Sequence, residues 1–132
     1  MKVYLGGPIN GCTDDEANGW RTEAKRAIES LGHTWLDPMA RDYRGREQEP
    51  GINKLIVEGD KKDIAACQVL LMNAPKPSAG TSMEILEGWN TRKVVITVVP
   101  VGDKPSPWIT YHSTRTCYGS VVKAITDYLT GK

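Results

Sequence analysis

Two kinds of hydrophobic pattern alternate along the chain. Short apolar runs of the kind found in buried strands occupy residues 2–6, 33–36, 68–73 and 93–99. Apolar residues recur at helical spacing in residues 13–31, 52–67, 81–92 and 120–129. A polar stretch over residues 37–51 has no clear period and predicts a long loop or lid, and residues 100–118 predict no definite element.

Strands that alternate with helices are typical of right-handed βαβ units. We therefore expect one domain over residues 1–132 with an α/β fold of the flavodoxin-like or Rossmann-like, doubly wound kind. Its mostly parallel sheet should have four to five strands, with helices on both faces. The first helix has a start signal, because Thr13-Asp-Asp-Glu16 matches a capping box.

Composition and charge exclude several classes of partner. The 39% hydrophobic and 25% charged residues are ordinary for a globular domain, and a net charge of +1 gives no basis for binding a nucleic-acid polymer or a membrane surface. Three cysteines stand singly, which favours a reducing, cytoplasmic compartment. The apolar runs are also too short to span a bilayer. Any nucleic-acid-like ligand should therefore be small.

Two loops are the candidate ligand sites. Ligands of an open parallel sheet bind beyond the carboxyl ends of the strands, which selects residues 7–11 after the first strand and 74–80 after the third. Both loops lead into a helix N-terminus, which attracts anions such as phosphate. The first loop lacks the G-x-G-x-x-G and Walker patterns, because Pro8 replaces the second glycine and no lysine follows. It is equally consistent with a tight turn.

Two carboxylates, Glu84 and Asp60, are candidates for catalysis, and each also has an ordinary structural explanation. Thr81-x-x-Glu84 matches a capping box, with Thr81 at the N-cap, and Asp60 lies in a charged helical run. Cleavage at an anomeric carbon, however, needs one carboxylate as nucleophile and a second acidic group near the departing atom. Acids from two different helices can supply both roles.

Four segments together resemble the nucleoside 2-deoxyribosyltransferase superfamily in order and spacing. They are "KVYLGGPING", "IVEGDKKDIAACQVLLMN", "PSAGTSMEI" and "SPWITYHST", and the match covers most of the chain apart from residues 37–51. The resemblance implies that Glu84 is the nucleophile that holds the sugar as a glycosyl ester. It also implies that Asp60 protonates or positions the base, and that Tyr4 orients the nucleophile.

The same resemblance bears on the substrate. Transferases of the superfamily have an aspartate six residues before the nucleophile, where this chain has Ser78. A serine there resembles the nucleotide N-hydrolase branch, in which hydroxyl groups receive a 5′-phosphate that an aspartate would repel. Ser106 matches a second phosphate-binding serine that comes from a neighbouring subunit, which implies a homo-oligomer, a dimer or higher. Pro8 and Asn10 depart from that branch's serine and arginine.

The sequence thus predicts cleavage of the N-glycosidic bond of a nucleoside or nucleoside 5′-monophosphate, with release to water or to a second base. The expected substrate-binding residues are Gly7, Ile9, Asn10, Gly11, Ser78, Gly80 and Ser106. We expect no metal site, because His33 and His112 lack partners at ligand spacing. We expect no organic cofactor either, because a carboxylate can itself stabilise the oxocarbenium-like transition state. The tryptophans are mostly core candidates, although Trp35 or Tyr43 is a candidate to stack on the base.

Two alternatives stay open. One is a phosphoribohydrolase of the lysine-decarboxylase-like fold, which also uses G-T-x-x-E but has a double glycine before it, where this chain has Pro77-Ser78-Ala79. The other is a nucleotide-binding or signalling module without turnover. The presence of both Asp60 and Glu84 disfavours the second alternative.

Overall fold

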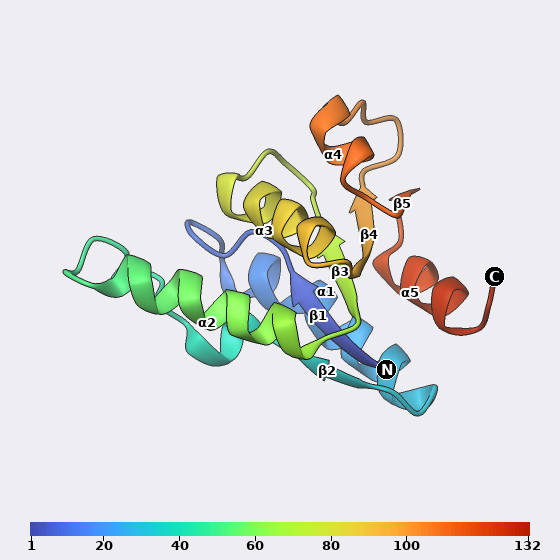
Figure 1. Ribbon diagram of the computed structural model, residues 1–132, viewed down its shortest axis with the longest axis horizontal. Helices are drawn as coiled ribbons and strands as arrows, with labels where there is room; N and C mark the ends of the chain where they lie inside the picture. The colour runs from blue at the N-terminus through green and yellow to red at the C-terminus, as the bar shows by residue number, and fades with distance from the viewer.

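A five-stranded parallel sheet forms the centre of the computed structural model, which describes residues 1–132 (Figure 1). The strands are β1 (Lys2–Gly6), β2 (Thr34–Leu36), β3 (Val69–Asn73), β4 (Val94–Val99) and β5 (Arg115–Tyr118). Their order is β2-β1-β3-β4-β5, and every neighbouring pair is parallel. The predicted doubly wound α/β fold is confirmed. The direction of winding reverses between β1 and β3, which is where this architecture binds ligands.

Helices cover both faces of this sheet (Figure 1). On one face, α1 (Asp14–Ser30) and α5 (Val121–Leu129) pack against alternate strand residues, including Val3 and Leu5. On the other face, α2 (Ile52–Ala66) and α3 (Ala79–Asn90) pack against the intervening ones, including Tyr4. The alternation follows from the two-residue period of a strand, because successive side chains point to opposite faces. Tyr4 therefore faces α2 and α3, the helices that carry Asp60 and Glu84.

Local sequence signals fix the ends and the packing of two helices. Thr13 and Glu16 form the predicted capping box of α1, with hydrogen bonds of 2.9 and 3.2 Å. In α3, a Cβ at Gly88 would lie 2.4 Å from the Leu70 side chain. Gly88 thus lets α3 approach β3 closely, and this approach sets the position of Glu84 one turn earlier.

The structure corrects three sequence predictions. Residues 100–118, which showed no clear pattern, contain the short helix α4 (Pro107–Tyr111) and strand β5. Helix α3 begins two residues earlier than predicted. Trp89 and Trp108 are not core residues, since they are 38% and 74% exposed and lie with Tyr111 and His112 in an aromatic cluster on the surface.

The segment over residues 37–51 is tied to the domain at several points. It opens with a short 3-10 helix, η1 (Pro38–Arg41), and Asp37 before it forms an ion pair of 2.6 Å with Lys25 of α1. Further along, Arg44 donates to the Cys12 carbonyl and to Asp14. The predicted lid is therefore fastened to α1 in this structure. None of the helices is long and apolar enough to cross a membrane.

Candidate active site

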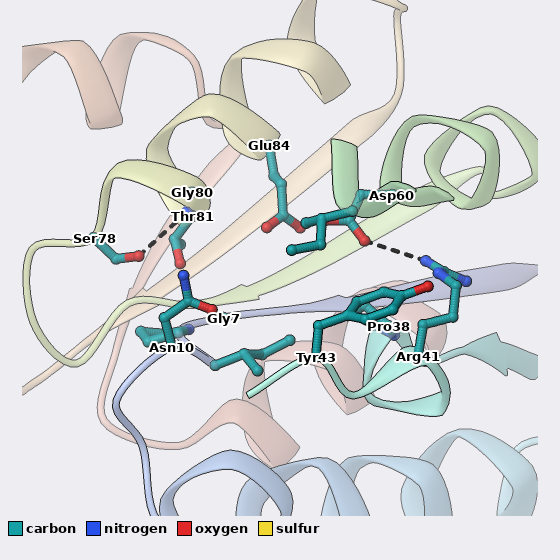
Figure 2. A pocket seen from close by; sticks show the side chains of 13 residues that line it. Gly7, Asn10, Pro38, Arg41, Tyr43, Asp60, Ser78, Gly80, Thr81 and Glu84 are labelled. Carbon is teal, nitrogen blue, oxygen red and sulfur yellow. Dashed lines mark hydrogen bonds and ion pairs between the residues drawn. The ribbon is translucent and has the colours of Figure 1, made fainter. Parts of the chain in front are cut away.

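A pocket opens at the carboxyl ends of β1 and β3, where the strand order reverses (Figure 2). Its cavity has a volume of about 140 Å³ and continues into a mouth that is open to solvent. Its walls come from the β1–α1 loop, from the segment over residues 37–51, and from helices α2 and α3. The lining residues are Gly7, Pro8, Ile9, Asn10, Pro38, Arg41, Tyr43, Ile56, Asp60, Ser78, Gly80, Thr81 and Glu84.

Glu84 lies in α3, and its carboxylate points into this pocket (Figure 2). The Tyr4 hydroxyl, which comes from the fully buried side chain on β1, donates to Glu84 Oε2 at 2.6 Å. A short hydrogen bond to one oxygen fixes the carboxylate and leaves the other oxygen free to react. The predicted orientation of Glu84 by Tyr4 therefore has a direct structural basis.

Burial controls the charge of both groups. It raises the pKa of Glu84 to about 8, while the Tyr4 hydrogen bond acts in the opposite direction and the nearby Asp60 charge adds to the rise. The pKa of Tyr4 rises far above its ordinary value through burial and through the neighbouring Glu84 and Asp60 carboxylates. Tyr4 consequently remains a hydrogen-bond donor throughout the physiological pH range.

Asp60 reaches the same pocket from α2, so the structure brings the two predicted acids together (Figure 2). Its Oδ1 lies 3.2 Å from Arg41 Nη2, and Arg41 Nη1 lies 2.8 Å from Asp63 Oδ2. Burial raises the pKa of Asp60, whereas the hydrogen bond and the charge of Arg41 lower it. Asp60 therefore belongs to an ion-pair network rather than to a solvated helix surface.

The first glycine loop lines the pocket only in part. Gly7, Ile9 and Asn10 lie in its wall as predicted, but Gly11 does not and instead occupies a left-handed turn with a φ of 72°. The loop is held from below by the buried Arg21 of α1, which donates to the Gly7 carbonyl at 3.1 Å. The turn itself accounts for glycine at this position, and a contact of Gly11 with a ligand stays a prediction.

The N-terminus of α3 is built differently from the predicted capping box. Ser78 is the N-cap, and its Oγ accepts from the Thr81 N–H at 3.4 Å, so Glu84 does not fold back onto Thr81. The Thr81 hydroxyl is buried without any hydrogen-bond partner. Its oxygen points toward the side-chain amide of Asn10 (Figure 2). The N-terminal turn of α3 thus presents Ser78, Gly80 and an unpaired hydroxyl to the cavity.

Ser106 lies in an adjoining hollow rather than in the pocket itself. It is the N-cap of α4, and its hydroxyl accepts from the Trp108 N–H at 3.2 Å. The hollow shares Ser78 and Thr81 with the pocket and also contains Lys76 and Lys104. Within one chain, Ser106 is therefore a neighbour of the predicted phosphate end and not a lining residue of the pocket.

The sequence interpretation missed two side chains at the site and assigned a third only to a helix cap. Arg41 lines the pocket and Arg21 supports its floor, yet no short motif marks either of them. Thr81, which was expected only as the N-cap of α3, also lines the pocket. Of the two aromatic candidates, Tyr43 lines the pocket whereas Trp35 does not and instead donates to Glu29 at 2.8 Å. No group of His, Cys, Asp and Glu side chains is arranged to hold a metal ion.

Cys67 is buried, as expected for a packed thiol. Burial raises its pKa to about 11, which keeps the thiol protonated and unreactive at neutral pH.

No protein-family model matches the sequence, and no curated protein matches it either. Solved structures do match. A 2-deoxyribosyltransferase from Bacillus psychrosaccharolyticus superposes with a TM-score of 0.69 at 20% identity, over 97% of this chain and 92% of that one. The Clostridium botulinum CMP N-glycosidase BcmB gives a TM-score of 0.66 at 14% identity, over 98% and 99% of the two chains.

A third match is a conserved protein from Enterococcus faecalis V583, with a TM-score of 0.71 at 14% identity over 99% of this chain and 98% of that one. Identities this low establish a shared fold. The chain therefore has the fold of the 2-deoxyribosyltransferase and of the CMP N-glycosidase, which confirms at the level of fold the resemblance to the nucleoside 2-deoxyribosyltransferase superfamily.

Proposed function

We propose that the protein cleaves the N-glycosidic bond of a nucleoside or nucleoside 5′-monophosphate through a covalent glycosyl-Glu84 intermediate. One observation carries the proposal. The Glu84 carboxylate accepts a 2.6 Å hydrogen bond from Tyr4 and points into a pocket that is also lined by Asp60. The shared fold with a 2-deoxyribosyltransferase and a CMP N-glycosidase supports the same reaction class.

In the first step, a Glu84 carboxylate oxygen forms a bond to C1′ of the sugar while the bond from C1′ to the base nitrogen breaks. The electron pair of the broken bond leaves with the base, which is protonated or held by Asp60. In the second step, water or another base attacks C1′, the ester bond breaks, and the Glu84 carboxylate is restored. The proton that the attacking group loses goes to Asp60, or to the departed base where Asp60 only held it. The Tyr4 hydroxyl orients Glu84 and stabilises its ionised form.

The nucleophile must be ionised, although burial raises its pKa to about 8. At neutral pH a minor but substantial fraction of Glu84 then carries a charge. A carboxylate that is poorly solvated is also a stronger partner for the positive charge that develops on the sugar in the transition state. The raised pKa is therefore compatible with a nucleophile, and strongly shifted pKa values are common at functional sites.

A phosphorylated substrate fits the α3 N-terminus better than an unphosphorylated one. Ser78 contributes a hydroxyl and no negative charge, Gly80 leaves open space, and the Thr81 hydroxyl has no partner within the protein. A 5′-phosphate placed there would accept hydrogen bonds from these hydroxyls and from helix N–H groups. We therefore favour a nucleoside 5′-monophosphate as the substrate.

We also propose that the protein acts as a homo-oligomer, as the resemblance implies for Ser106. Large aromatic side chains are exposed beside it, with Trp108 at 74% and Tyr111 at 70%. Burying such residues in an interface removes apolar area from water. Light scattering coupled to size-exclusion chromatography should report a dimer or a larger oligomer. A monomer at the concentration used in the activity assay would reject the proposed homo-oligomer.

The experiment that tests the reaction is a product analysis. The protein is incubated with a panel of nucleosides and 5′-monophosphates, with and without a second free base, and the products are resolved by chromatography. Free base with sugar phosphate indicates hydrolysis, and a new nucleoside indicates transfer. Tight nucleotide binding without release of any base would instead favour the binding module.

A further inference from the structure

Gly59 lies inside helix α2, where glycine is unfavourable because it costs backbone entropy and has low helix propensity. A close contact explains its presence. A Cβ at this position would lie 2.7 Å from Nε and 3.1 Å from Cζ of Arg41. The Arg41 guanidinium therefore lies directly against the helix backbone, on a surface that only glycine leaves open.

The same guanidinium bridges two carboxylates on that face of α2. Nη2 lies 3.2 Å from Asp60 Oδ1, and Nη1 lies 2.8 Å from Asp63 Oδ2. Residues three and four apart are neighbours on a helix surface, which places Asp63 beside both Gly59 and Asp60. All three charged side chains are largely shielded, since the exposed fractions are 30% for Arg41, 19% for Asp60 and 16% for Asp63. We call Arg41, Gly59, Asp60 and Asp63 the arginine clasp.

Arg41 approaches α2 from a fixed position. It ends η1, and the other end of η1 is held by Asp37, whose Oδ1 accepts from the Met39 N–H at 2.8 Å. Asp37 is itself paired with Lys25 at 2.6 Å and lies 3.5 Å from the buried Arg21. A short segment anchored at both ends presents the guanidinium to Asp60, at the rim of the pocket (Figure 2).

We propose that Arg41, seated on Gly59 and anchored by Asp63, is a positioning residue that fixes the orientation and the charge of the Asp60 carboxylate. The inference rests on the proposed function, in which Asp60 serves the departing base. A planar guanidinium can hold two carboxylates at once, which a lysine ammonium on a flexible stem does less well. In this role Arg41 acts through Asp60 and not by contact with the substrate.

Electrostatics point in the same direction as the geometry. The charged and titratable groups that face Asp60 are Tyr4 of β1, Arg21 of α1, Arg41 of η1, Asp63 of its own helix and Glu84 of α3. Burial raises the pKa of Asp60, and Arg41 provides the largest opposing contribution. Removing the guanidinium should therefore raise the Asp60 pKa further.

The test compares Arg41→Met, Arg41→Lys and Gly59→Ala with the intact protein. Arg46→Met is the matched control, because Arg46 lies in the same segment and pairs with Glu49 at 3.0 Å but does not line the pocket. The pKa of Asp60 is measured by carbon-detected NMR titration of its carboxyl group, and base release is measured separately at pH 7. Gly59→Ala is the second variant that keeps the test valid if Arg41→Met folds poorly, since alanine favours the helix.

In Arg41→Met the Asp60 pKa should rise by about 1 or more, as expected when an opposite charge within hydrogen-bond distance is lost. Gly59→Ala should shift it in the same direction, because the added Cβ displaces the guanidinium, and Arg41→Lys should give an intermediate value. The kcat/KM for base release should fall on the order of 10²-fold in Arg41→Met, as for a misplaced catalytic group. The Arg46→Met control should match the intact protein in both measurements.

An Asp60 pKa unchanged in both Arg41→Met and Gly59→Ala would overturn the proposal. An unchanged value in Gly59→Ala alone would overturn the assigned role of Gly59 as the seat. The titration does not depend on turnover, so it tests the role of Arg41 even if no substrate of the panel releases a base. An absence of base release would reject the proposed function, and the positioning of Asp60 by Arg41 would then be judged from the Asp60 pKa alone.

Discussion

Tyr4 and Glu84 are eighty positions apart in the sequence, yet their side chains meet through a 2.6 Å hydrogen bond at the edge of the pocket. The contact exists because β1 directs alternate residues toward α3, and because Gly88 allows α3 to pack closely on β3. It joins a permanent donor to a carboxylate whose pKa is raised to about 8.

Replacing Tyr4 with phenylalanine removes a hydrogen bond that favours the ionised form of Glu84. The pKa of Glu84 should therefore rise above its value of about 8, and the ionised fraction at pH 7 should fall. Each increase of 1 in the pKa reduces kcat/KM at pH 7 by about 10-fold. Carbon-detected NMR titration of the Glu84 carboxyl measures the shift. Tyr118→Phe, at a tyrosine that is 53% exposed, is the control, and a Tyr4→Phe variant that titrates like it would contradict the assigned role.

Glu84→Gln should make the protein more stable at neutral pH. The pKa of Glu84 is 4.5 in the unfolded chain and about 8 in the folded one, so the folded state binds more protons between these values. The stability that the protonated side chain contributes is fully present below about pH 4.5 and is lost as the pH rises through about 8. Glutamine keeps the shape and never ionises, so it avoids this loss.

The gain in the free energy of unfolding should be close to zero at pH 4 and on the order of 1–3 kcal/mol at pH 7.5. Urea unfolding of the two proteins at both pH values measures it. A difference that is the same at pH 4 and pH 7.5 would show that burial does not raise the pKa of this carboxyl group.

Thr81→Val tests whether the unpaired Thr81 hydroxyl forms a hydrogen bond with a bound ligand. Without substrate, the variant should be more stable by about 1 kcal/mol, because a buried hydroxyl without a partner is removed. With a 5′-monophosphate, KM should increase about 10-fold or more, because a hydrogen bond to a charged phosphate is lost. The KM for the corresponding nucleoside should not change. Equal effects on both substrates would place the phosphate elsewhere.

Ser78→Asp should reverse the preference between nucleotide and nucleoside. Aspartate is a good N-cap, so helix α3 is retained, but its charge repels a 5′-phosphate at the same helix end. The ratio of kcat/KM for the monophosphate to that for the nucleoside should fall by about 10- to 100-fold, equivalent to about 1.4–2.7 kcal/mol. Ser78→Asn, a neutral N-cap of nearly the same size, is the matched control. Identical ratios in the two variants would eliminate the charge argument.

The fold was largely predictable because its signals are local. The β-branched run of β4 and the capping box of Thr13 and Glu16 act within a few residues, and the alternation of strand and helix determines the fold class. Strand β5 gave no such signal. Only four residues form it, and the partly buried side chains lie at an edge of the sheet where packing on β4 determines the conformation.

Site residues were predictable from the sequence where they belong to a recognisable motif. They were not predictable where only tertiary contacts place them at the site. Glu84 and Asp60 were candidates from the chemistry of paired carboxylates, and the resemblance added Tyr4 and the role of each residue. The structure brings the three together. The N-cap of α3 was misplaced because Ser78 and Thr81 both have good N-cap side chains, and only the path of the preceding loop selects Ser78. Arg41 was missed because its partners are about twenty residues away in the sequence.

The most direct test of the central claim is the mass of the protein during turnover. The enzyme is mixed with a 5′-monophosphate that it consumes, quenched in acid within the first turnover, and analysed intact and after digestion by mass spectrometry. The account predicts an added mass equal to that of the sugar phosphate less one water, carried by the peptide that contains Glu84 and absent from Glu84→Gln. Base release by the intact protein with no adduct at any time point, or an adduct that persists in Glu84→Gln, would contradict it.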